Sequence, residues 1–229
     1  MSYGLSVKND GSYIQIDSET PRLCCLYNGV YSAGSRVAIV NFPAPIVTPE
    51  PPCIFIRNSP SAPNDIYDKL VLLGSPGNWT GFQVWANNVN SRPTGKWFAA
   101  VFATVAADSY GMRLWGPNGA MVFDSGATPV TVTRCTNSWS YAGYGQVGAI
   151  GTATWWNCNL PAGPLLEDEY FMINPFSRVM LQPNNRTAAT GAIRWVYASN
   201  SLQLYAAANS SNWIDMGSPG AVFARLPGT

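Results

Sequence analysis

The stretch YGLSVKNDGSYIQIDS at residues 3–18 predicts a β-hairpin and, through a second copy, the fold of the whole chain. Apolar and polar residues alternate on both sides of Asn9, Asp10 and Gly11. A turn of this composition between two alternating runs is typical of a tight hairpin. We therefore expect an antiparallel hairpin here, with Gly11 in the positive-φ conformation that such turns require.

The same pattern returns 107 positions later, in YGMRLWGPNGAMVFDS at residues 110–125. Tyr, Gly, Asp and Ser recur unchanged, and the positions between them keep their apolar character. We expect a second hairpin at 110–124, with Gly119 at positive φ. The Asp-Ser pairs predict a structural role for Asp17 and Asp124, because such side chains accept hydrogen bonds from nearby backbone amides and turn the chain. The alternative, a repeated metal ligand or catalytic carboxylate, stays open.

The rest of the chain has the composition of a β protein. The 21 glycines and 18 prolines leave few windows for a helix, and short runs of β-branched and aromatic residues alternate with turn clusters. The sequence predicts an all-β fold, an antiparallel β-sandwich or pair of sandwiches with little helix. Residues 43–52 hold five prolines, which predicts a stiff extended connection that can pair only as an edge strand. Further strands are expected at 22–27, 36–42, 53–57, 69–73, 81–86, 96–106, 130–134, 152–157, 170–173, 178–182, 192–198 and 222–225.

The repeat also predicts the domain organisation. A chain of 229 residues fits one large domain or two small ones. Because each copy of the hairpin would open a unit of its own, we expect two related β-sandwich halves, 1–108 and 109–229, that meet near Asp108. One merged β domain over 1–229 is the alternative.

The composition excludes several classes of function. Histidine is absent, which removes the commonest general base and the commonest zinc ligand, and with them a Ser-His-Asp triad or a histidine metal site in one chain. The net charge of +1 argues against nucleic-acid binding through a basic field. No apolar run is long enough to span a bilayer as a helix, and no secretion signal precedes the first hairpin. We expect no enzyme, no cofactor, no metal, no nucleic-acid partner and no membrane insertion.

The five cysteines are expected to be buried, reduced thiols. Their odd number cannot pair completely, and no Cys-x-x-Cys motif is present. Cys24 and Cys25 are adjacent, so in a strand they would point to opposite faces. The other three are Cys53, Cys135 and Cys158.

The one dense acidic cluster lies at residues 167–169, after a turn rich in proline and glycine. A solvated turn is the simpler interpretation. The alternatives are an ion site or glycoside hydrolysis, because Glu167 and Glu169 would share a face of a strand and two carboxylates are the minimum for that reaction. Elsewhere the oxygen ligands that calcium prefers gather only weakly, at Asn64, Asp65 and Asp68.

Aromatic residues mark the candidate contact site. The segment 139–145 is aromatic, rich in glycine and expected to be flexible, and a Trp-Trp pair follows it. Aromatic faces beside Asn and Ser suit a subunit interface or a glycan, since sugars offer apolar faces and polar edges. Adjacent Trp155 and Trp156 cannot both enter one core from a strand. The candidate interface or glycan-contact residues are Trp139, Tyr141, Tyr144, Trp155 and Trp156.

The hairpin pattern resembles that of a group of proteins from the tail gene clusters of tailed bacteriophages. Many of them open with Met-Ser-Tyr-Gly-Leu, as residues 1–5 do here, and residues 111–125 match their hairpin best. The resemblance implies a structural component of the virion, in the tail tip, the baseplate or a fibre, made in the host cytoplasm and without catalytic residues. It implies other tail proteins as partners, a homo-oligomer, and contact with a host receptor or glycan.

The composition agrees with assembly. Only 11% of residues are charged, while the chain holds nine Trp and 11 Tyr. Solubility normally requires abundant surface charge, so much of this surface would be neutral or covered by partner subunits. Two alternatives remain: a carbohydrate-binding β-sandwich module, and a glycan hydrolase that uses Glu167 or Glu169.

Overall fold

The computed structural model describes residues 6–8, 14–17, 21–61, 65–104, 109–147, 151–176, 179–181, 188–207 and 219–228. These residues form antiparallel β-strands joined by turns, with one short 3-10 turn and no α-helix in the described part of the chain, so the predicted all-β class is confirmed. The elements are β1 (Ser6–Lys8), β2 (Ile14–Asp17), β3 (Cys24–Ser32), β4 (Val37–Ile46), β5 (Cys53–Asn58), β6 (Tyr67–Ser75), β7 (Asn78–Ala86), β8 (Thr94–Val101), β9 (Arg113–Trp115), β10 (Met121–Asp124), β11 (Thr128–Pro129), β12 (Thr131–Thr136), β13 (Trp139–Val147), β14 (Gly151–Cys158), β15 (Tyr170–Met172), η2 (Asn174–Phe176), β16 (Val179–Leu181), β17 (Ala188–Val196), β18 (Ser201–Ala207) and β19 (Ala221–Arg225).

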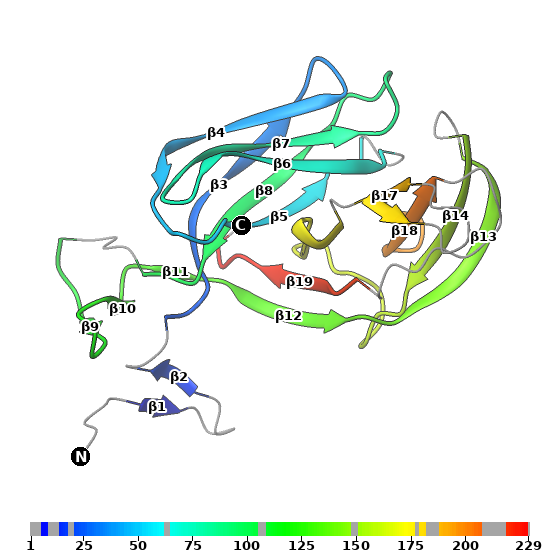
Figure 1. Ribbon diagram of the computed structural model, residues 1–229. Helices are drawn as coiled ribbons and strands as arrows, with labels where there is room; N and C mark the ends of the chain where they lie inside the picture. Colours follow the sequence, from blue (N-terminus) through cyan, green and yellow to red (C-terminus); the bar gives the residue numbers. More distant parts are fainter. Residues whose placement is uncertain are drawn as a thin grey trace.

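Two large sheets face each other in a sandwich-like arrangement (Figure 1). The eight-stranded sheet has the order β13-β14-β18-β17-β6-β7-β4, with β16 paired to β17 off this path. The seven-stranded sheet has the order β11-β3-β8-β5-β15-β19-β12. Both sheets therefore combine strands from residues 1–108 with strands from residues 109–229. The division into halves 1–108 and 109–229, and the alternative of one merged domain over 1–229, both stay predictions.

The seven-stranded sheet curls into a half-barrel because one stretch of chain joins its two edges. Residues 128–136 run almost continuously through β11 and β12. At the start of this stretch Thr128 pairs with Cys25 of β3, and further on Val132 pairs with Ala224 of β19. The Val130 N–H donates to the Leu23 carbonyl at 2.9 Å and continues the first pairing. The sheet must therefore bend around one of its faces.

Each face of the curled sheet covers its own core. Between the two sheets lies the main core, where Phe82 of β7 meets Trp97 of β8 edge to face, with ring centroids 5.2 Å apart. On the other face Phe55 of β5 stacks on Phe98 of β8 at 4.6 Å, and Tyr170 of β15 meets Phe98 edge to face at 5.0 Å. The residues of this second core all come from the curled sheet or its connections. They are buried because the sheet bends around them.

The two predicted hairpins form, and they share one register. β1 pairs with β2 and β9 with β10, both antiparallel. The bounds of β9 and β10 are those of β1 and β2 moved by the spacing of the sequence repeat, and the paired residues correspond one to one, including the shift in register. Gly119 has φ 76°, as predicted. Gly11 lies outside the described residues. The hairpins stand beside the body at one end of the molecule (Figure 1).

Every strand predicted from the sequence has a counterpart, with ends that differ by several residues. The proline-rich stretch behaves as predicted: β4 carries Pro43 and Pro45 and is the edge strand of the eight-stranded sheet. Two long strands, β13 and β18, were missing from the prediction. Residues 139–145 are therefore not the flexible segment expected, because antiparallel pairing with β14 holds them extended.

Candidate functional site

The aromatic segment forms one end of the eight-stranded sheet. β13 is its edge strand, and β14 pairs with β13 on one side and with β18 on the other. Tyr141 lies opposite Trp156 and Gly143 lies opposite Trp155. The five predicted contact residues thus come together on two neighbouring strands.

The Trp-Trp pair divides between two faces, as predicted. Trp156 is 2% exposed and belongs to the main core. Trp155 points to the opposite face, where its ring stacks with that of Tyr205 at 6.2 Å. The Trp155 ring also covers Gly143, where a Cβ would lie 2.5 Å from it. Both tryptophans therefore have a packing role inside the chain.

Three further aromatics of the site differ in exposure. Trp139 meets Phe176 edge to face at 5.9 Å and donates its indole N–H to the Pro219 carbonyl at 2.8 Å, so it anchors the start of β13. Tyr141 is 65% exposed and Tyr144 is 39% exposed. Of the predicted contact residues, these two tyrosines offer the most surface to a partner.

The acidic cluster corrects the sequence analysis. Glu167 and Asp168 lie in an exposed turn, as expected, but Glu169 is fully buried, so a solvated position was wrong for this residue. Its carboxylate binds the Arg134 guanidinium at two points, each at 3.0 Å. It also accepts hydrogen bonds from the Thr133 hydroxyl at 2.6 Å and from the Leu166 N–H at 2.7 Å. Burial is possible because every polar contact of the carboxylate is made within the protein.

Arg57 of β5 holds the same turn from the other side. Its guanidinium donates to the carbonyls of Leu166 at 2.6 Å and of Glu167, and lies 4.6 Å from the centroid of the Trp195 ring. Asp168 in turn forms an ion pair with Arg225 at 2.9 Å. These contacts hold the turn against β5 and β19.

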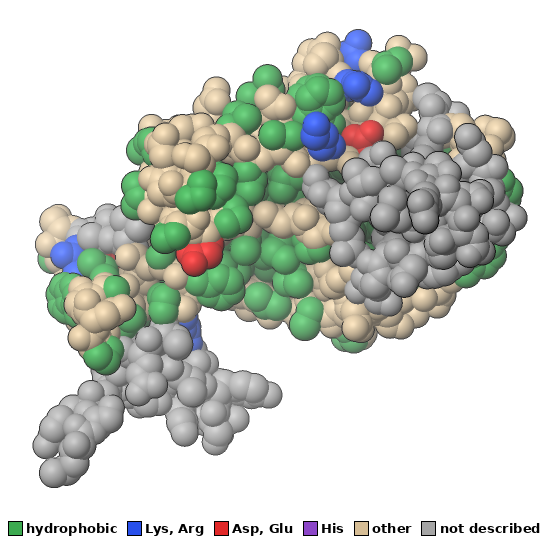
Figure 2. Space-filling view, in the orientation of Figure 1, with side chains coloured by type: hydrophobic (Ala, Val, Ile, Leu, Met, Phe, Trp, Pro, Cys, Tyr) green, Lys and Arg blue, Asp and Glu red, His purple; other side chains and the backbone are tan. Residues whose placement is uncertain are grey.

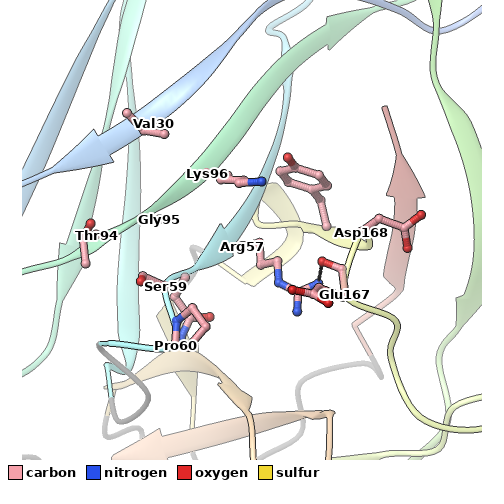
Figure 3. A pocket seen from close by; sticks show the side chains of 11 residues that line it. Val30, Arg57, Ser59, Pro60, Thr94, Gly95, Lys96, Glu167 and Asp168 are labelled. Atoms are coloured by element: carbon pink, nitrogen blue, oxygen red, sulfur yellow. Dashed lines mark hydrogen bonds between the residues drawn. The ribbon is translucent and has the colours of Figure 1, made fainter. Parts of the chain in front are cut away.

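A hollow of about 310 Å³ opens where the curled sheet ends (Figure 3). Val30, Lys96 and Arg57 lie side by side on β3, β8 and β5 and share the face of the second core, so the hollow is the mouth of that core. Tyr170, which packs against Phe98, lines its inner part. The remaining lining residues are Asn58, Ser59, Pro60, Thr94, Gly95, Glu167 and Asp168.

The charges around the hollow suit a small polar ligand. Within the described residues the Lys96 ammonium has neither an ion-pair nor a hydrogen-bond partner. Glu167 is exposed at the rim, and the hydroxyls of Ser59 and Thr94 lie in the same lining. Pockets of about this volume in the mouth of a closed or curled sheet are common binding sites. The sequence does not reveal this site because its residues come from four distant segments.

The other candidate ligands stay apart. The Asp68 carboxylate accepts a hydrogen bond from the Asn87 side chain at 3.1 Å. Asp65 is buried, and burial raises the pKa of its carboxyl above the ordinary value. Among the described residues no group of three or more Cys, Asp or Glu is placed to hold a metal ion. Asn64 lies outside the described residues.

Four of the five cysteines are at least partly buried, and all five are free thiols. Burial raises the pKa of Cys25 to about 11 and that of Cys158 to about 12, so both are protonated at neutral pH. Cys135 is exposed on β12, which corrects the expectation of a buried thiol there. No residue of β12 is buried, so this strand lies at the surface.

The β9–β10 hairpin holds its shape through polar contacts. Asp124 accepts hydrogen bonds from the Gly126 N–H at 2.7 Å and from the Arg113 side chain at 2.8 Å. The Ser125 hydroxyl accepts one from the Met112 N–H at 3.0 Å. The structural role predicted for Asp124 is confirmed, while Asp17 lies on β2, whose side chains are not described.

The comparisons with known proteins return no relative. No protein-family model, no curated protein and no solved structure matches the chain. Among the described residues no helix has the length and apolar character needed to cross a membrane.

Proposed function

We propose that this protein acts by assembly, as a structural component of a bacteriophage virion in the tail tip, the baseplate or a fibre. Its partners would be other tail proteins, further copies of the chain and, at the cell surface, a host receptor or glycan. The resemblance of the two hairpins to phage tail proteins supports this role. Both hairpins form, with one shared register, outside the two large sheets.

The observation that carries the proposal is the placement of large apolar side chains at the surface. Tyr110 and Trp115 of the second hairpin are 85% and 56% exposed, and Tyr141 of β13 is 65% exposed. Protein interfaces are enriched in Tyr and Trp. Assembly would remove this surface from water.

The edges of the eight-stranded sheet support the same role. The edge strand β4 carries Pro43 and Pro45, which block pairing with another chain. The opposite edge, β13, reads WSYAGYGQV and contains neither a proline nor a charged residue. Proteins that remain monomeric usually protect such an edge with charges or proline. The β13 edge is therefore open to a partner.

The chemistry of the acidic turn favours assembly over glycan hydrolysis. A glycosidase needs two carboxylates on opposite sides of the bond to be cleaved. Here Glu169 is buried against Arg134, and Asp168 is paired with Arg225. Among the described residues, Glu167 is the one carboxylate of this turn that stays exposed and outside an ion pair, and a single carboxylate does not supply both roles.

The decisive experiment is to look for the chain in purified particles. Mass spectrometry of density-purified virions should find the protein at a fixed stoichiometry to the other tail proteins, and gold-labelled antibody should mark one end of the tail. Particles from a phage that lacks the gene are the control. Absence of the chain from washed virions would contradict the proposal.

A second candidate, carbohydrate binding, is favoured by the Lys96 ammonium in the hollow, which has no partner among the described residues. A saccharide could place hydroxyl or carboxylate oxygens on Lys96 and on the hydroxyls of Ser59 and Thr94. Isothermal titration with short host-surface saccharides should then show binding that Lys96→Ala weakens at least tenfold, with the exposed Lys69→Ala as control. Equal affinity of the two variants would exclude this site.

A further inference from the structure

Tyr110 is the one repeated residue that the second hairpin does not explain. Four residues recur unchanged between the copies: Tyr, Gly, Asp and Ser. Asp124 and Ser125 bind backbone and side chain within the hairpin. Gly111 must be glycine, because its φ is 139° and a Cβ would lie 2.4 Å from the Ser125 hydroxyl. Tyr110 is 85% exposed, and within the described residues no hydrogen bond or ring contact involves its side chain.

Tyr110 is one of three exposed large apolar side chains on the same hairpin. Met112 is 46% exposed and Trp115 is 56% exposed. Figure 2 shows hydrophobic side chains on this projecting part of the molecule. Since the hairpin is held together by polar contacts, these three side chains are free to serve a partner.

The two hairpins contact each other within the chain. β10 of the second hairpin lies against β2 of the first. Each hairpin is a two-stranded sheet, so in the described structure β1 and β9 each have an unpaired edge. The two hairpins pair their strands in one register. A surface that packs against its own copy inside a chain can do so between chains.

From these observations we infer that the β9–β10 hairpin, with Tyr110, Met112 and Trp115, is a docking surface for the hairpins of a second copy of this chain. The inference rests on the proposed function, assembly, and assigns it a surface and a partner. The contact between copies continues the hairpin-to-hairpin packing seen within one chain. It would bury the apolar side chains that the hairpin leaves outside and use the free edges of β1 and β9.

The first test compares two surface changes in the full-length protein. Sedimentation velocity should show the unmodified chain as an oligomer, and the double variant Tyr110→Ser with Trp115→Ser should raise the dissociation constant at least tenfold. Val89→Ser removes an exposed apolar side chain on the loop after β7 and is the control, for which no shift is expected. All three proteins should melt at the same temperature, because the changed side chains lie outside the core.

The second test traps the contact without removing it. In a Cys135→Ser background, which removes the exposed native thiol, single-cysteine changes at Tyr110, Met112 and Trp115 should form disulfide-linked dimers under mild oxidation. Such bonds need the two Cα atoms to lie within about 7 Å of each other. Val89→Cys, at an exposed loop position, is the control and should form no disulfide-linked dimer.

The outcomes separate this inference from the proposed function. An unmodified chain that stays monomeric at all concentrations, or a double variant that assembles as well as the unmodified chain, overturns the docking surface. If the chain is nonetheless present in virions, the proposed function stands and the hairpin's partner is a different tail protein. Cross-linking no better than that of Val89→Cys also overturns the inference.

Discussion

The sandwich body and the β9–β10 hairpin use aromatic side chains in opposite ways. In the body Phe55 and Phe98 are fully buried and stack at 4.6 Å. In the hairpin Trp115 and Tyr110 are among the most exposed large side chains of the described structure. The body needs its aromatics to fold. The hairpin is shaped by Asp124 and its neighbours, so its aromatics are available for another molecule.

The two regions also differ in how they use an ion pair. Glu169 and Arg134 lie inside the body, with side chains 0% and 9% exposed, and they lock the turn at 166–169 onto β12. Arg113 and Asp124 bridge the two strands of the hairpin, and the arginine is partly open to solvent. The first pair supports the global fold, and the second supports a local shape.

The largest effect is expected from removing an aromatic ring from the second core. Phe98→Ala removes the ring that contacts both Phe55 and Tyr170, and it should lower the free energy of unfolding by about 4 kcal/mol. Trp115→Ala on the hairpin should change it by less than about 0.5 kcal/mol. Urea denaturation of both variants measures the difference. If both variants lost a similar free energy of unfolding, the proposed difference between body and hairpin would be wrong.

The two ion pairs give the next largest difference. Glu169→Ala leaves the buried Arg134 guanidinium without its carboxylate and should cost about 3 kcal/mol in global stability. Asp124→Ala should mainly loosen the hairpin, which amide hydrogen exchange would report as faster exchange confined to residues 111–126. If Asp124→Ala lowered the global free energy of unfolding as much as Glu169→Ala does, the hairpin would be part of the folding core.

Glycine substitutions sharpen the account of the hairpin itself. Gly111→Ala combines a positive φ with a Cβ that would lie 2.4 Å from the Ser125 hydroxyl, and we expect a cost of about 2 kcal/mol in the stability of the hairpin. Gly119→Val has open space around its Cβ and carries only the backbone strain, for about 1 kcal/mol. Hydrogen exchange of the hairpin amides would rank them. The double variant Gly111→Ala with Ser125→Ala should recover part of the loss, and no recovery would contradict the steric explanation.

The smallest effect concerns the thiols at high pH. Burial raises the pKa of Cys25 to about 11 from 9.0. Because the folded pKa is the higher one, the contribution of Cys25 to stability is complete below pH 9 and is lost as the pH rises toward 11. We expect a loss of about 1 kcal/mol, since the thiol is only partly shielded from solvent. Cys25→Ser should flatten this dependence in denaturation curves between pH 8 and 11.

The sequence predicted most strands because their residues alternate between two environments. The hairpin turns, the proline-rich edge at β4 and the opposed faces of Trp155 and Trp156 all follow from local rules. β13 was missed because its Gly and Ser residues weaken the strand signal. The reason for its Gly143 is the Trp155 ring on the neighbouring strand, a contact that no local pattern contains.

The sites that the sequence could not predict form only because residues 128–136 join the two edges of the seven-stranded sheet. The curl of the seven-stranded sheet needs residues 128–136 to pair with strands that lie far before and far after them. That closure creates the second core and, at its mouth, the hollow beside Lys96. Glu169 looked like a member of a solvated cluster because Arg134, its partner, is 35 residues away. The sequence predicts that Tyr110 belongs to a hairpin, but it does not predict that the side chain is exposed, because alternation of apolar and polar residues does not show which face is covered.

The central claim, that the chain works by assembly through its hairpins, is tested most directly by electron cryomicroscopy of the assembled particle. Density for the β9–β10 hairpin should be buried against the hairpins of a neighbouring copy, with Tyr110 and Trp115 inside the contact. A hairpin that projects freely into solvent, in a particle whose subunits meet through other surfaces, would contradict the claim.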